Sequence, residues 1–79
     1  MGYVDTTMKV IERIASNQLR EQEEDNYPKN IAEEVGINRS TLNDRLSFLE
    51  DIGVAKKVRQ GQKKIIRLNS VVIQSVRRN

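Results

Sequence analysis

The sequence has 79 residues and contains no cysteine, no histidine and only one proline. The lack of cysteine excludes disulfide bonds and thiolate metal sites. The lack of histidine removes the most common general base and the most common neutral metal ligand, so that only carboxylates and lysines remain as catalytic candidates. We therefore expect a protein that is not an enzyme, with no catalytic residues, no bound metal and no cofactor.

Long apolar runs are also lacking. No stretch approaches the roughly 20 residues that span a bilayer, and the first residues do not form a basic region followed by an apolar one. We expect a cytoplasmic protein, associated with the nucleoid and not with membranes. Aromatic residues are few, namely Tyr3, Tyr27 and Phe48, the last of which we expect to be buried. This scarcity disfavours RNA binding, which commonly stacks bases on aromatic rings.

Charge is distributed unevenly along the chain. Residues 1–53 contain six basic and eleven acidic residues, whereas residues 54–79 contain eight basic residues and no acidic one. A solvated surface usually mixes both signs. Eight cations without an anion therefore indicate a polyanionic partner, and not merely a solvated face.

The length fits one small domain, residues 1–79, and its N-terminal part shows helical periodicity. We predict a first helix over residues 5–20, with Asp5 or Thr6 as its N-cap. Its buried stripe is expected to contain Met8, Ile11, Ala15 and Leu19, with Val10 and Ile14 beside it as a second stripe. The acidic run "EQEEDN" that follows is interpreted as a frayed end or a loop.

Two further helices follow at short intervals. Tyr27 is expected to be extended because it precedes Pro28, which suits the first turn of a helix over residues 28–35. Gly36 would end this helix in a left-handed conformation. Asn38 would then cap a third helix over residues 39–51, whose buried side chains are Leu42, Leu46 and Leu49.

The periodicity then changes to that of strands. Residues 54–59 and 64–68 are short, rich in β-branched residues and separated by "QGQK", which predicts a hairpin with Val58 opposite Ile65. Residues 70–78 are predicted to form a helix capped by Asn69 or Ser70. Their β-branched content leaves a strand as the rival assignment.

The stretch "AEEVGINRSTLNDRL" has the spacing of a helix-turn-helix. Ala32 would allow close approach of two helices, Gly36 would form the turn, and Leu42 would fix the crossing from the second helix. An ordinary pair of antiparallel helices could show the same three residues by chance. The basic hairpin that follows makes the DNA-binding interpretation the stronger one.

Residues 31–58, "IAEEVGINRSTLNDRLSFLEDIGVAKKV", resemble winged helix-turn-helix transcriptional regulators, in particular the minimal core of the multiple-antibiotic-resistance and arsenic-repressor families. The resemblance implies a mainly α fold with a small β-hairpin: a three-helix core, a two-stranded wing over residues 54–68 and a short C-terminal helix. It also implies a recognition helix that begins near Asn38, with Arg39, Ser40, Thr41 and Asn43 nearest the bases or phosphates.

The candidate site has two parts, one on the recognition helix and one on the wing. Asp44 departs from the family pattern, in which a basic residue is usual, so more of the affinity is expected from the wing. Wing cations could instead protect a strand edge, but six exceed that need. The predicted DNA-binding residues are Asn38, Arg39, Ser40, Thr41, Asn43, Asp44, Arg45 and Ser47 on the helix, and Lys56, Lys57, Arg59, Gln60, Gln62, Lys63, Lys64 and Arg67 on the wing.

The expected function is sequence-specific binding of double-stranded DNA by a transcriptional regulator such as a repressor. The recognition helix would lie in the major groove and the wing on the backbone or in the minor groove. The alternative is a winged helix that joins proteins in a transcription, replication or sorting complex. Some arsenic-repressor relatives sense metals, but this chain lacks such ligands. We expect constitutive binding, or regulation by concentration or by a partner.

A homodimer is expected because palindromic operators are commonly read by dimers. The first helix and the C-terminal segment offer apolar residues beyond the needs of a three-helix core: Val10 and Ile14 on the former, and Val72, Ile73 and Val76 on the latter. The alternative is that these residues pack on each other within one chain.

Overall fold

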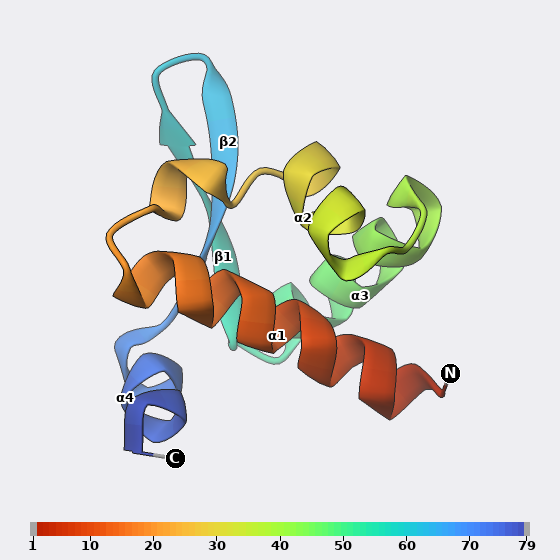
Figure 1. The fold of residues 1–79 in the computed structure, drawn as a ribbon, viewed down its shortest axis with the longest axis horizontal. Helices are drawn as coiled ribbons and strands as arrows, with labels where there is room; N and C mark the ends of the chain where they lie inside the picture. Colours follow the sequence, from red (N-terminus) through yellow and green to blue (C-terminus); the bar gives the residue numbers. More distant parts are fainter. Residues whose placement is uncertain (1, 79) are drawn as a thin grey trace.

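The computed structural model describes residues 2–78. The elements are α1 (Tyr3–Leu19), the short 3₁₀ turn η1 (Glu23–Asp25), α2 (Pro28–Val35), α3 (Arg39–Asp51), β1 (Ala55–Gln60), β2 (Lys63–Leu68) and α4 (Ser70–Arg78). Figure 1 shows α1 running across the molecule, with α2 and α3 beside it, the β1–β2 hairpin projecting from the body and α4 below the C-terminal half of α1. This is the predicted fold, mainly helical with a two-stranded wing.

The turn between α2 and α3 has the predicted geometry. Tyr27 is extended before Pro28, and Gly36 ends α2 with φ of 82°, a left-handed conformation that glycine adopts without steric strain. The backbone amides of Gly36 and Ile37 both donate to the carbonyl of Ala32, at 2.9 and 3.0 Å. The side-chain oxygen of Asn38 accepts from the amide of Thr41 at 2.7 Å, so the predicted N-cap of α3 is confirmed.

The hairpin has the predicted register but a tighter turn. Val58 pairs with Ile65, as expected, and the ladder continues until Gln60 pairs with Lys63. The expected four-residue loop is therefore a two-residue turn formed by Gly61 and Gln62. Gly61 has φ of 64° at the first turn position, where a type II′ hairpin requires glycine.

The buried face of α1 differs from the predicted one. Val10 and Ile14 are fully buried in the core, whereas Met8 and Leu19 are 47% and 39% exposed. The predicted cap is also wrong, because the helix begins at Tyr3 and Gly2 occupies the N-cap position. The two apolar stripes are adjacent on the helix, so periodicity alone did not determine which one faces α2, α3 and the sheet.

The acidic segment after α1 is not a simple frayed end. It contains η1, and Asn26 at its end is fully buried. The backbone carbonyl of Asn26 accepts from the amide of Ile66 at 2.7 Å, so this segment pairs with the outer edge of β2 at one point. The predicted loop is therefore attached to the base of the wing.

The C-terminal segment is a helix, and the strand assignment is wrong. The side-chain oxygen of Asn69 accepts from the amide of Val72 at 2.9 Å, which identifies Asn69 as the cap. Val72, Ile73 and Val76 are partly buried against the core that contains Val10 and Ile14. The apolar residues of α1 and α4 that were considered for a homodimer therefore pack together within one chain, as the alternative interpretation predicted.

Candidate nucleic-acid interface

One face of α3 is free of the core. Leu42, Leu46 and Leu49 are buried, and their spacing of four and three residues leaves the opposite side of the helix to solvent. That side carries the exposed polar residues Arg39, Ser40, Asn43, Asp44 and Ser47. Their side chains can donate to or accept from base edges and phosphates.

Asn38 and Thr41 lie at the start of α3, but they take part in the N-cap of the helix and do not belong to its freely exposed face. The oxygen of the Asn38 side chain is bound to the amide of Thr41, and Thr41 itself is half-buried. An N-cap side chain is held in one orientation by its own helix. The oxygen of Asn38 is therefore engaged within its own helix, whereas its NH₂ group takes no part in that hydrogen bond.

Arg45 does not belong to the exposed face. Its side chain is only 15% exposed, and its guanidinium lies 3.7 Å from the centre of the Tyr3 ring on α1. Tyr3 in turn contacts Phe48 edge to face, with ring centres 5.8 Å apart. Arg45 also pairs with Asp44, whose side chain is 63% exposed. The Asp44 carboxylate therefore already has a cationic partner in the protein, which reduces the repulsion of phosphates expected from the sequence.

The two faces of the hairpin have different neighbours. Side chains of residues that pair across the strands lie on the same face of the hairpin. Lys57 pairs with Ile66, and Arg59 pairs with Lys64. Both pairs lie on one face, with Arg59 and Lys64 nearer the tip. The ammonium group of Lys57 lies 3.7 Å from the carboxylate of Glu50 on α3. This face of the wing is therefore the one turned toward α3.

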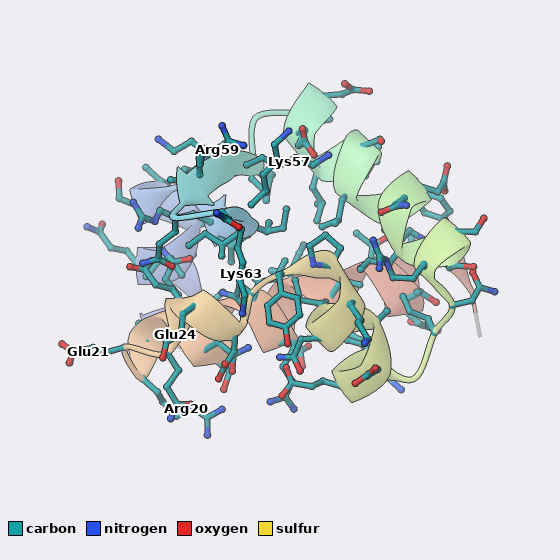
Figure 2. All side chains as sticks on the ribbon, turned by 90° about the horizontal axis from the view of Figure 1, so that it is seen from above. Arg20, Glu21, Glu24, Lys57, Arg59 and Lys63 are labelled. Atoms are coloured by element: carbon teal, nitrogen blue, oxygen red, sulfur yellow. The ribbon has the colours of Figure 1, made fainter. Side chains whose placement is uncertain are left out.

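The other face of the hairpin meets η1 and Tyr27. The guanidinium of Arg67 binds Glu23 of η1, with nitrogen to oxygen distances of 2.9 and 3.0 Å. The ammonium group of Lys63 lies 4.5 Å from the centre of the Tyr27 ring. Figure 2 shows Lys57 and Arg59 on the α3 side of the hairpin, Lys63 directed to the other side, and Glu21 and Glu24 beyond it on the acidic segment.

The predicted wing cations thus fall into two groups. Lys57 and Arg67 are each paired with a carboxylate, at Glu50 and Glu23. Within residues 2–78, the other cations of the wing have no ion-pair partner. These cations are Lys56, Arg59, Lys63 and Lys64, and all are exposed, as are Gln60 and Gln62 at the tip.

A buried polar cluster at the base of the wing was not anticipated from the sequence. Asn17 of α1 donates to the side-chain oxygen of Asn26 at 2.9 Å, and Asn26 donates to the carbonyl of Ile14 at 3.1 Å. Gln18 binds both backbone groups of Leu68, at 3.0 and 3.3 Å. A signal was available, because Asn17 continues the spacing of Val10 and Ile14 along the buried face of α1.

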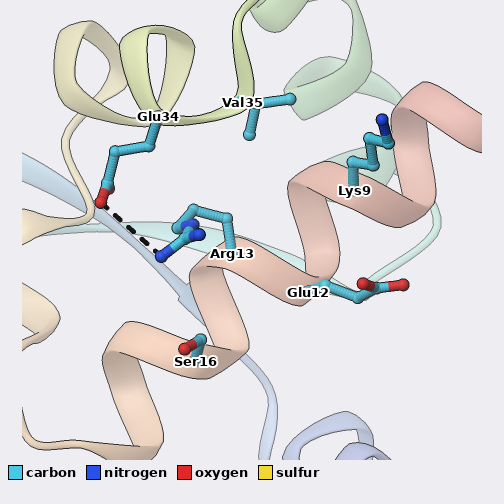
Figure 3. Close-up of a pocket in the computed structure, with 6 residues that line it drawn as sticks. All are labelled: Lys9, Glu12, Arg13, Ser16, Glu34 and Val35. Atoms are coloured by element: carbon cyan, nitrogen blue, oxygen red, sulfur yellow. Dashed lines mark ion pairs between the residues drawn. The ribbon is translucent and has the colours of Figure 1, made fainter.

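A separate hollow lies between α1 and α2. It measures about 400 Å³ and is lined by Lys9, Glu12, Arg13, Ser16, Glu34 and Val35. Figure 3 shows Arg13 and Glu34 directed toward each other across it, with 3.7 Å between guanidinium and carboxylate. Over residues 2–78 no group of three or more acidic side chains is placed to hold a metal ion.

Among the helices of residues 2–78, none combines the length and apolar character that crossing a membrane requires.

Comparison with known families supports the interpretation of this geometry. Residues 28–56, fewer than half of the chain, match a family model described as winged helix-turn-helix DNA-binding. No curated protein and no solved structure matches the chain. The match covers α2, α3 and the first residues of β1, and the remainder of the wing follows directly in the structure. The described residues therefore have the arrangement of a winged helix, and residues 28–56 are similar to the winged helix-turn-helix DNA-binding family.

Proposed function

We propose that this protein binds duplex DNA in a sequence-dependent manner and acts as a transcriptional regulator. The observation that carries the proposal is the alignment of two surfaces: the exposed polar face of α3 and the face of the hairpin that carries Arg59 and Lys64. The ion pair between Lys57 and Glu50 connects them. A duplex lying on α3 would meet unpaired cations on that side of the wing.

The two surfaces would contact different parts of the DNA. Side chains of α3, chiefly Arg39, Ser40, Asn43 and Ser47, are of a kind that reads base edges in the major groove. Arg59 and Lys64 would contact phosphates on the flanking backbone or enter the minor groove. The acidic residues of η1 lie on the opposite face of the wing, where they would repel a phosphate backbone. DNA would therefore approach from the α3 side only.

The protein would bind each DNA site as a monomer. The apolar residues first assigned to a homodimer lie in the core or pack against it. Dimerisation would consequently need another surface, and the proposed DNA contacts do not require one. Such a protein would be found with the nucleoid in the cytoplasm, and its regulation would follow from its concentration or from a protein partner. No catalytic step forms part of this proposal.

Fluorescence anisotropy with labelled duplex DNA tests the proposal. The two phosphate contacts of Arg59 and Lys64 alone would weaken binding about tenfold between roughly 50 and 200 mM salt, because each contact releases condensed counterions. Selection from a random DNA pool should yield a preferred sequence. No binding at the lowest salt concentration would contradict the proposal and favour a winged helix that joins proteins; salt-dependent binding without any preferred sequence would contradict its sequence-dependent part.

A further inference from the structure

Exposed apolar side chains gather at one place on the protein. Within residues 2–78, seven large hydrophobic residues remain exposed, and two of these, Leu19 and Val71, stand apart. Single exposed apolar residues are ordinary, whereas a contiguous set commonly marks an interaction surface. The other five line one groove and are Tyr3, Val4, Met8, Phe48 and Ile52.

This groove, the α1–α3 groove, lies between the N-terminal half of α1 and the C-terminal half of α3. It encloses about 250 Å³ and is completed by Thr7, Ile11, Leu49 and Val54. None of these lining side chains is charged. The volume lies below the range typical of small-molecule sites, about 300 to 1,000 Å³, and the groove is open to the surface. A few apolar side chains projecting from another protein would fit it better.

The charge around the α1–α3 groove favours a cationic occupant. Asp5 lies one turn from Met8 on α1, and Asp44 and Asp51 neighbour Phe48 at positions i−4 and i+3 on α3. Two cations are also near. Lys9 follows Met8, and Arg45 is held by Tyr3 and Asp44.

Beside the groove the three carboxylates of Asp5, Asp44 and Asp51 thus exceed the two cations by one. A second copy of the chain would bring the same carboxylates together in a symmetric contact and repel. A basic partner would instead be attracted.

The position of the groove between two helices favours a helical occupant. A channel between two helices accepts the apolar stripe of a third helix, with anchors at positions such as i, i+3 and i+7. We propose that the α1–α3 groove binds an amphipathic helix of another protein, with lysine or arginine on both sides of its apolar stripe.

Binding there is compatible with DNA binding. Successive residues of a helix are about 100° apart around its axis, so Phe48 and Ile52 are turned away from Ser40, Asn43 and Ser47. The DNA-reading face and the α1–α3 groove thus occupy different sides of α3. This inference does not depend on the proposed function, since it concerns another surface and another ligand.

Two synthetic peptides of about 18 residues, each a helix of about 27 Å, would serve as probes. One carries leucine and alanine on one face and lysine on the other, and the second replaces every lysine by glutamate. A scrambled peptide with the same lysine content controls for charge alone. Heteronuclear NMR titration of the intact chain should show shifts at Met8, Phe48 and Ile52 with the first peptide only.

Variants at highly exposed positions provide the structural control. Ile52→Ser and, independently, Val4→Ser should each weaken binding of the lysine peptide about tenfold, as expected for the loss of one buried aliphatic contact. Val71→Ser on α4 removes a similarly exposed apolar side chain outside the groove and should leave binding unchanged. Circular dichroism melts confirm that each variant folds, and DNA affinity should be the same in all three.

Three results would overturn the proposal. Equal shifts with the scrambled peptide would show that charge alone attracts the probe. Equal weakening by Val71→Ser would place binding outside the groove. A dimer in sedimentation velocity that Ile52→Ser dissociates would show that the groove is occupied by a second copy of the chain.

Discussion

Asn26 joins three parts of the molecule through a single buried residue. Its side chain connects to Asn17 and to the carbonyl of Ile14 on α1, while its backbone carbonyl accepts from Ile66 on β2. A buried amide of this kind contributes to stability only while all its partners are present, because each unpaired group costs free energy in the interior. Asn26 therefore fixes the position of the wing relative to the helices.

Replacing Asn26 by alanine should lower the free energy of unfolding by about 2 kcal/mol, because the Asn17 amide loses its shorter hydrogen bond and keeps only the 3.4 Å contact with Glu34, and the Ile14 carbonyl loses the Asn26 donor. Urea denaturation followed by circular dichroism measures the change. Gln74→Ala removes an exposed amide on α4 and should change stability by less than about 0.5 kcal/mol. Similar losses for both variants would show that the Asn26 cluster is not a stabilising contact.

At the scale of elements, the wing is a ribbon with two different faces. Alternation along β1 and β2 sends Arg59 and Lys64 to the α3 side and Lys56 and Lys63 to the η1 side. Each pair carries two positive charges, and within residues 2–78 none of the four has an ion-pair partner. The two pairs therefore form a comparison that is matched in charge and differs in the face of the wing, with Lys63 also in contact with Tyr27.

The double variant Arg59→Ala with Lys64→Ala should weaken binding to all DNA sequences and reduce the slope of log affinity against log salt by about 1.8, the value for two lost phosphate contacts. Lys56→Ala with Lys63→Ala removes the same charge and should reduce the slope by less than half as much. Anisotropy titrations over a range of salt concentrations give both slopes. Equal slopes would mean that DNA does not distinguish the faces of the wing.

Substitutions on α3 should change sequence preference, in contrast to those on the wing. Replacing Arg39 or Asn43 by alanine should change which sequences are selected from a random pool, because contacts to base edges carry about 1 to 3 kcal/mol of discrimination. Ser75→Ala, at an exposed position on α4, is the control. A uniform loss of affinity without any change of preference would place these two residues on phosphates.

At the scale of the whole molecule, an acidic segment lies beside one face of the wing, and unpaired cations lie on both faces toward its tip. The acidic segment at η1 binds the base of the hairpin through Glu23 and Arg67, while unpaired cations continue toward the tip. Figure 1 shows this segment and the hairpin next to each other, with α3 on the other side of α2. The resulting field would orient the protein before contact with a polyanion.

In the absence of ligands the protein should be a monomer. The apolar residues first considered for a dimer are in the core or packed against it, so they are not available for the roughly 800 Å² per partner that stable interfaces bury. Sedimentation velocity at about 50 µM, where a dimer of micromolar affinity would be populated, measures this. A dimer at this concentration would contradict the expectation and would favour DNA sites with two-fold symmetry.

Local signals in the sequence were sufficient for the helix-turn-helix and the hairpin. Pro28, Gly36 and Asn38 specify backbone conformation or capping at their own positions, and these effects act over three or four residues. The pairing of Val58 with Ile65 follows from strand alternation and a glycine turn. The exposed face of α3 follows from the spacing of its leucines.

Only the tertiary structure decided which stripe of α1 is buried, that Arg45 lies against Tyr3, and which wing cations remain unpaired. The sequence determined the helical period and the number of charges, because these are properties of neighbouring residues. The choice of face and of ion-pair partner depends on elements that meet across long sequence separations: Arg67 with Glu23, and Gln18 with Leu68. Patterns of neighbouring residues do not predict those contacts, since they form only when the helices and the hairpin pack together.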